Sequence, residues 1–410
     1  MLNNKVIQIL LNNIYPISLY CRQIAGTVVI LFLARFLSVY DYGIFTSYKA
    51  QAAFLLLFAN LGYNEYVLVS SQKVIRDVQL KIGLFVINAI SILLLIGICS
   101  MFVPLESKYI FILVLIRTFL DNTFFFLILP YFQAAKKFSI ISLVNIFYSA
   151  MMILITIVSY IYHFSLAKFL WCNIALGIVN FIQVSFYAKV NYLLVITHIK
   201  ELIKKIDKSI FAYVGVLLCS YLYSQIPSLY SSIFVTKEDA ALYFSSFTIA
   251  SIICLLIIAQ VQKIIPELMK TSVSNIKNIL KTNLFVMNSI NIFIFILFIF
   301  AGKDILNLIY GQDYYSGGYI MLLILTFSNI SIAVASIYGA YITASGNQKM
   351  KIKMQVEAIL ISLITLAVLD SLGIYAAAIA YFLSATHIGI RYTHRAKQLL
   401  KQQEILENKE

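Results

Sequence analysis

The sequence predicts an all-α, polytopic membrane protein with about twelve transmembrane helices. Of its 410 residues, 61% are hydrophobic and only 12% are charged, whereas soluble domains carry about a quarter charged residues. Apolar runs of roughly 20 residues recur along the whole chain, and each is long enough to cross about 30 Å of hydrocarbon. Lysine and arginine collect in alternate loops between these runs. Lipid is therefore the predicted solvent of most of the surface.

The apolar runs divide into six and six around the longest polar stretch, residues 189–209. The expected spans of the first half are Tyr15–Phe36, Gly43–Val69, Ile82–Val103, Tyr109–Phe132, Ile140–Tyr162 and Phe169–Ala188. Those of the second half are Phe211–Val235, Leu242–Gln262, Asn283–Ala301, Tyr319–Thr343, Ile352–Leu369 and Ile374–Tyr392. We therefore expect an N-terminal six-helix lobe over residues 1–188, an amphipathic cytoplasmic linker over 189–209, and a C-terminal six-helix lobe with a cytoplasmic tail over 210–410.

The positions of the cations predict the orientation. Most lysines and arginines, Arg391 included, fall in one set of alternate loops, and the other set holds only Arg35, Lys108, Lys168, Lys237 and Lys303. Because cytoplasmic loops are enriched in these residues, both termini are expected in the cytoplasm. The formal net charge of +14 then indicates attraction to anionic lipid headgroups and requires no nucleic-acid partner.

A weak internal repeat also supports two lobes. Asp41-Tyr-Gly-Ile-Phe-Thr-Ser follows the first span, and Asp239-Ala-Ala-Leu-Tyr-Phe-Ser follows the seventh. Each segment is expected in a short external turn. An offset of six helices is typical of parallel repeats in transporters.

Sequence motifs for catalysis or metal binding are absent. The chain has no Walker loop, no glycine-rich dinucleotide turn, no His-Glu-x-x-His and no Gly-x-Ser-x-Gly. Its five cysteines are far apart and form no Cys-x-x-Cys pair. We expect neither an enzyme nor a metal site nor an organic cofactor.

Charged residues inside the expected spans are the strongest candidates for function, because they are costly in lipid and usually face a cavity or a partner. Arg22 lies roughly 10 Å in from the cytoplasmic end of its span, at a rise of about 1.5 Å per residue. Lys49 and Arg117 lie at a similar depth from the external side. Cations at successive depths suit a phosphate or diphosphate moving across the membrane, and arginine grips phosphate oxygens with a bidentate fork.

Two acidic residues, Asp121 and Glu65, are candidates for charge balance or ion coupling. Other interpretations stay open. Arg117 and Asp121 are four residues apart and can neutralise each other on one helix face, Lys49 can extend to the outer headgroups, and Glu65 can lie at a helix end. The sequence does not decide between proton coupling, sodium coupling and no coupling ion.

Amide side chains in the spans are candidates for contacts with sugar hydroxyls: Asn145, Asn180, Gln183 and Asn288. Asn173 and Asn291 are of the same kind. The alternative role of all these amides is hydrogen bonding between helices.

Four segments resemble the polysaccharide flippases of the Wzx type, within the multidrug/oligosaccharidyl-lipid/polysaccharide (MOP) exporter superfamily. They are Leu33-Ala-Arg-Phe-Leu-Ser-Val-Tyr-Asp-Tyr-Gly-Ile-Phe, Tyr131-Phe-Gln-Ala-Ala-Lys-Lys-Phe, Leu222-Tyr-Ser-Gln-Ile-Pro-Ser-Leu and Ile305-Leu-Asn-Leu-Ile-Tyr-Gly-Gln-Asp-Tyr. The similarity in layout covers nearly the whole chain. The sequence departs from the family at Ala241, where glycine is usual, and at Pro227, where an acid is frequent.

The resemblance implies a bacterial inner-membrane transporter of MATE-like, V-shaped architecture, with two six-helix bundles around a cationic lumen. The implied cargo is an undecaprenyl-diphosphate-linked O-antigen or capsule repeat unit. The implied partners are membrane lipid, a polysaccharide polymerase and a chain-length regulator. Two alternatives stay open: a cation-coupled multidrug exporter of the same fold, and a membrane glycosyltransferase or polymerase.

Overall fold

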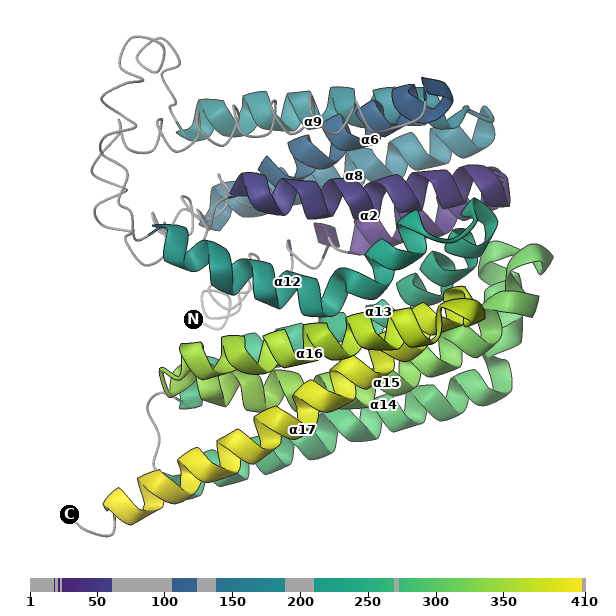
Figure 1. Cartoon of the computed structure of the whole chain (residues 1–410). Helices are drawn as coiled ribbons and strands as arrows, with labels where there is room; N and C mark the ends of the chain where they lie inside the picture. Colours follow the sequence, from purple (N-terminus) through teal and green to yellow (C-terminus); the bar gives the residue numbers. More distant parts are fainter. Residues whose placement is uncertain are drawn as a thin grey trace, which may run out of the picture. The chain divides into compact units, whose positions relative to one another are not determined.

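The computed structural model describes residues 18, 21–22, 24–60, 105–123, 138–188, 210–268 and 273–407, and all its regular structure in these ranges is helical (Figure 1). After a first helix, Ile24–Phe36, the elements follow in the order α2 (Val39–Asn60), α6 (Leu105–Thr123), α8 (Phe138–Ile161), α9 (Leu166–Ala188), α12 (Ile210–Ile233), α13 (Lys237–Leu268), α14 (Val273–Tyr310), α15 (Gln312–Ala344), α16 (Gln348–Val368), the 3₁₀ helix η2 (Asp370–Leu372) and α17 (Ile374–Glu407). Each expected span overlaps one of these helices, except the third, residues 82–103, which lies outside the described residues, as do Glu65 and the predicted linker.

The chain divides into two compact units, Met1–Leu218 and Cys219–Glu410. The division falls within α12, shortly after the predicted linker. In the first unit α6 packs against both α2 and α9, and α8 packs against α9. These helices bring together the intramembrane charges that the sequence analysis singled out.

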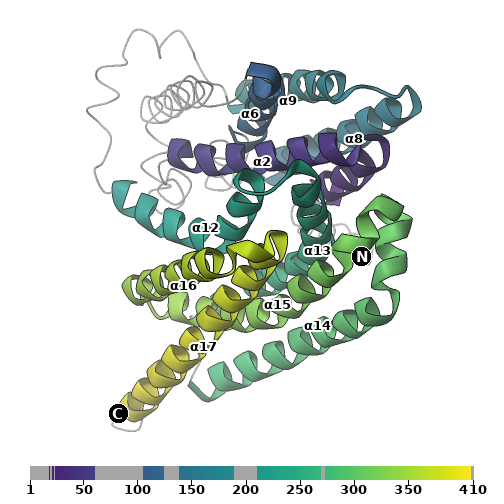
Figure 2. The ribbon, with the colours of Figure 1, turned by 45° about the vertical axis from the view of Figure 1, so that its right-hand side comes forward.

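The second unit is built around α15, which packs against α13, α14 and α17, while α16 packs along α17 (Figure 2). Small residues allow these helices to approach closely. A Cβ atom at Gly389 of α17 would lie 3.2 Å from the backbone oxygen of Ser331 on α15. At Gly318 of α15 it would lie 3.0 Å from Oγ of Ser246 on α13, and that hydroxyl donates to the Gly318 carbonyl at 2.8 Å.

Apolar side chains cover the outside of the helices. Among the described residues, four stretches are long and apolar enough to span a membrane: Ser139–Ile161, Leu166–Gln183, Val273–Tyr310 and Gln312–Ala344. On α14, Phe285, Phe293 and Phe300 are 75%, 68% and 81% exposed. Phenylalanine at this exposure along one helix requires a lipid environment. The chain is a multi-pass membrane protein.

The prediction that the two repeat segments lie in short external turns is wrong, because both lie at the beginnings of helices. Asp41 and Asp239 both lie in the first turn of a helix, α2 and α13. The backbone N–H of Asp41 donates to Oγ of Ser38 at 3.0 Å, and that of Asp239 donates to Oγ1 of Thr236 at 3.2 Å. A hydroxyl followed three residues later by an acid therefore begins a helix in each unit, as in a capping box.

Pro227 lies inside α12, as the sequence predicts. A proline within a helix removes one backbone hydrogen bond and bends the helix, and Figure 1 shows α12 bending part way along its length. Oγ of Ser231 donates to the Pro227 carbonyl at 3.0 Å, one turn further on.

Candidate functional site: a cationic cluster in the first unit

Arg22 is held by side chains from two helices of the first unit, α6 and α8. Arg22 is only 5% exposed. Nη1 donates to Oδ1 of Asn145 on α8 at 3.3 Å, and Nη2 lies 3.9 Å from Oδ1 of Asp121 on α6. Cζ lies 4.0 Å from the centroid of the Tyr148 ring, also on α8. Stacking, a charged partner and an amide acceptor together fix the guanidinium in one orientation.

Asp121 and Tyr148, which both contact this arginine, also contact each other. The hydroxyl of Tyr148 donates to the Asp121 carboxylate, whose side chain remains 27% exposed. Nδ2 of Asn145 donates to Oγ of Ser18 at 3.4 Å, and Asn145 itself is fully buried. This network supplies the hydrogen bonds that buried polar groups require.

Arg117 and Lys49 add two further cations beside this network. Arg117 of α6 is 6% exposed, and its Cζ lies 5.5 Å from the ring centroid of Phe45 and 6.0 Å from that of Phe169. Its Nε is buried and has no hydrogen-bond partner among the residues described. Lys49 of α2 is half-buried and interacts electrostatically with both Arg117 and Asp121.

Among the described residues, the cluster therefore holds three cations, Arg22, Lys49 and Arg117, and the carboxylate of Asp121. Uncompensated charge within a membrane protein is costly unless an anion or water neutralises it. Because Arg117 and Lys49 repel each other electrostatically, an anionic ligand that contacts both relieves an existing repulsion. The chemistry of the cluster thus suits the binding of a multiply charged anion.

The described contacts bear on two of the alternatives left open by the sequence. Asp121 forms its ion pair with Arg22 on another helix, and within the described residues no ion pair joins it to Arg117, its neighbour on α6. Asn145 bonds to Arg22 and Ser18, so it has the interhelical role. The sequence could not show this, because the rotation of each helix about its axis decides which side chains meet.

The remaining amide candidates differ in their surroundings. Asn173 donates to the Phe169 carbonyl of its own helix at 2.9 Å, and Asn291 donates to the Asn329 carbonyl at 3.4 Å. The side-chain oxygens of Asn180, Gln183 and Asn288 are buried and have no hydrogen-bond partner among the described residues.

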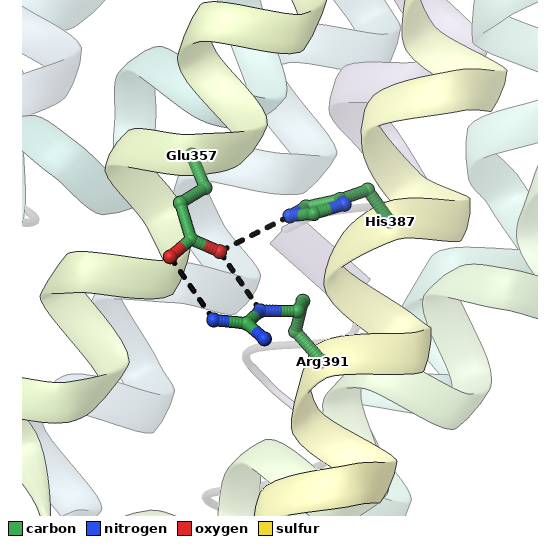
Figure 3. A network of polar contacts seen from close by, with 3 residues as sticks. All are labelled: Glu357, His387 and Arg391. Atoms are coloured by element: carbon green, nitrogen blue, oxygen red, sulfur yellow. Dashed lines mark hydrogen bonds and ion pairs between the residues drawn. The ribbon is translucent and has the colours of Figure 1, made fainter.

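Sequence reasoning missed a second charged group, in the second unit (Figure 3). Glu357 of α16 accepts from Arg391 of α17 at both oxygens, at 2.8 Å from Nε and 3.1 Å from Nη2. Nε2 of His387 lies 3.3 Å from the same carboxylate. The pattern of cations places Arg391 in a cytoplasmic loop, and no sequence pattern indicates a functional role for Glu357. The available signal was the spacing of His387 and Arg391, four residues apart on one helix face, opposite an acid inside the eleventh span.

Comparison with solved structures identifies the fold. The lipid II flippase MurJ, in an inward closed conformation, matches with a TM-score of 0.73 and 14% identity over 93% of this chain and 87% of that one. An inward-facing multidrug resistance MATE family transporter of the MOP superfamily matches with a TM-score of 0.64 and 10% identity, covering 93% and 95%. A variant of the MATE transporter VcmN of Vibrio cholerae gives 0.62 and 12%, covering 97% of each chain.

The sequence itself matches no protein-family model and no curated protein. At 10–14% identity, the structural matches speak for the fold. They confirm the predicted all-helical, MOP-like polytopic architecture over nearly the full length. The chain therefore has the fold of the MOP superfamily transporters.

Proposed function

We propose that this protein is a flippase that moves a lipid-linked oligosaccharide, carried on undecaprenyl diphosphate, across the bacterial inner membrane by alternating access. The observation that carries the proposal is the excess of cations over acids in the Arg22–Lys49–Arg117 cluster. A diphosphate bears several negative charges, so it suits a site with three cations and one carboxylate. The fold shared with a lipid II flippase gives independent support.

Each member of the cluster has a proposed role. Arg22 and Arg117 hold diphosphate oxygens through their planar guanidinium groups, and Lys49 adds a mobile point charge. Asp121 and the Tyr148 ring orient Arg22 and prevent it from binding the anion too tightly to release it. Asn180, Gln183 and Asn288 contact sugar hydroxyls, and the prenyl chain stays in lipid. A polymerase and a chain-length regulator then act on the exported repeat unit.

A cation-coupled multidrug exporter is the second candidate, because MATE transporters share this fold. A site for cationic drugs requires an excess of acidic groups, whereas the described cluster has more cationic than acidic groups. A membrane glycosyltransferase or polymerase has less support, since the matched structures are those of transporters and a flippase.

Deletion of the gene in its native bacterium tests the proposed function. Surface polysaccharide is analysed by gel, and lipid-linked oligosaccharide in the membrane by mass spectrometry. We expect loss of polymer together with accumulation of complete single repeat units on undecaprenyl diphosphate, inaccessible to reagents added from outside. Normal surface polysaccharide with raised sensitivity to cationic dyes would overturn the proposal in favour of the drug exporter.

A further inference from the structure

The Glu357–His387–Arg391 triad joins α16 to α17 within the second unit (Figure 3). Glu357 lies inside the expected span Ile352–Leu369, and the other two residues lie near the end of the span Ile374–Tyr392. Their side chains are half-buried, at 29% exposed for Glu357, 27% for His387 and 42% for Arg391. Three ionisable groups with this exposure are too costly to face hydrocarbon, so this face of α16 and α17 has access to water.

The contacts determine which atom of the triad takes up a proton. Both oxygens of Glu357 accept from the Arg391 guanidinium, which stabilises the carboxylate in its charged form. A carboxylate only accepts hydrogen bonds, so the neutral His387 ring carries its hydrogen on Nε2, facing Glu357 at 3.3 Å. Nδ1 then holds the free lone pair. Histidine is the side chain that changes charge between about pH 5 and 8.

The neighbouring helices bring few competing charges to the triad. Lys353 lies one turn before Glu357 on α16, and His394 lies two turns after His387 on α17, where it contacts Gln398. Further ionisable groups on these helices include Lys349 and Lys351 of α16, Tyr338 and Tyr341 of α15, Tyr243 and Cys254 of α13, Lys277 of α14, Asp370 of η2 and, next to Arg391 on α17, Tyr392.

Two of these groups have their own partners, because Lys277 pairs with Glu404 and Asp370 accepts from Tyr230. The middle of α15 carries no ionisable residue between Tyr319 and Tyr338, and it meets α17 through the neutral Ser331–Thr386 pair at 3.1 Å. Glu357 and Arg391 are therefore the charges that act most directly on His387.

We propose that the triad is a proton-binding site, in which Nδ1 of His387 takes up one proton from water and Glu357 stabilises the resulting imidazolium. The net charge of the triad then rises from zero to plus one, and His387 competes with Arg391 for the same carboxylate. The link between α16 and α17 thus depends on protonation. A role of this proton as the coupling ion of transport rests on the proposed function. The binding of the proton does not rest on it.

The chain contains four histidines, His163, His198, His387 and His394, so histidine-selective isotope labelling gives a simple NMR spectrum. The full-length protein in lipid nanodiscs is titrated from pH 4.5 to 8.5, and His387→Gln assigns the signal. We expect the His387 ring to take up a proton during this titration. Glu357→Gln should weaken the uptake and Arg391→Gln should strengthen it, because the first removes the acid that stabilises the imidazolium and the second removes a competing cation.

His163, in the first unit, is the internal control, since both substitutions are in the second unit and its signal should be the same in both variants. A His387 ring that does not titrate, or a midpoint unchanged in Glu357→Gln, would contradict the proton site.

A parallel export assay addresses coupling: His387→Gln should flatten the pH dependence of export. Absence of any lipid-linked cargo export by the wild-type protein refutes the proposed flippase and leaves the NMR result intact, so the two failures are distinguishable.

Discussion

The two units of the molecule treat charge inside the membrane in different ways. In the first unit, Arg22 and Arg117 are 5% and 6% exposed, and three cations share one carboxylate. In the second, Glu357 and Arg391 form a balanced, bidentate and half-exposed pair. An unbalanced buried cluster suits a ligand that brings the missing charge, whereas a balanced accessible group suits the uptake of a single proton. In our proposals the cluster binds the cargo and the triad binds a proton, so the two sites lie in different units.

The largest expected loss of stability follows from substitution of Arg22 in the first unit's cluster. Arg22→Gln leaves the Asp121 carboxylate and the Tyr148 ring without their cation, so the free energy of unfolding should fall by about 3–5 kcal/mol. Denaturation by SDS in mixed micelles measures this change. The double variant R22Q/D121N removes both charges and should recover most of the loss. A double variant as unstable as the single one would show that Asp121 does not depend on Arg22.

A backbone contact in the second unit should come next in size. Gly389→Val places a side chain against the Ser331 carbonyl, where even a Cβ atom would lie 3.2 Å away. Overpacking of this kind destabilises by about 1–3 kcal/mol. We expect a lower SDS midpoint with no change at the first unit's cluster. Gly26→Val is the matched control, because a Cβ at Gly26 meets nothing within 4 Å.

The repeated N-caps allow a direct comparison of the two units. Ser38→Ala and Thr236→Ala each remove the hydroxyl that accepts from a first-turn N–H, and each should cost about 1 kcal/mol. Hydrogen exchange at the first turns of α2 and α13 locates the effect. Equal costs would agree with equivalent caps in the two units. A cost at one position alone would show that the sequence repeat is not a structural equivalence.

The smallest expected effect concerns the triad. Arg391→Gln should change the free energy of unfolding by no more than about 1 kcal/mol, because a half-exposed ion pair gains little in a screened environment. The SDS midpoint should stay close to that of the wild type. A loss as large as that of Arg22→Gln would remove the distinction between the two units and make the triad a structural element.

The helices were predictable from the sequence because lipid imposes the length and apolar character of each span. The expected intramembrane charges Arg22, Lys49, Arg117 and Asp121 do lie together. Their pairing was not predictable: Asp121 meets Arg22 rather than its helical neighbour Arg117, since packing fixes which faces meet. The sequence pattern does not single out Glu357, because this residue lies one turn after a lysine-rich helix start and such charged segments are also typical of loops. Its partners come from a helix about thirty positions later in the sequence.

The measurement that tests the central claim most directly is the binding of farnesyl diphosphate to the purified protein in nanodiscs. Wild type, R22Q/D121N and Arg35→Gln are compared, with farnesol as the probe without phosphate. Arg35 lies in the first helix, Ile24–Phe36, and is exposed. We predict that R22Q/D121N weakens diphosphate binding roughly 10- to 100-fold, as expected for the loss of charged hydrogen bonds worth about 1.5–3 kcal/mol, while Arg35→Gln and the farnesol control are unaffected. Equal affinity of wild type and R22Q/D121N for the diphosphate would contradict the assignment of this cluster to the cargo.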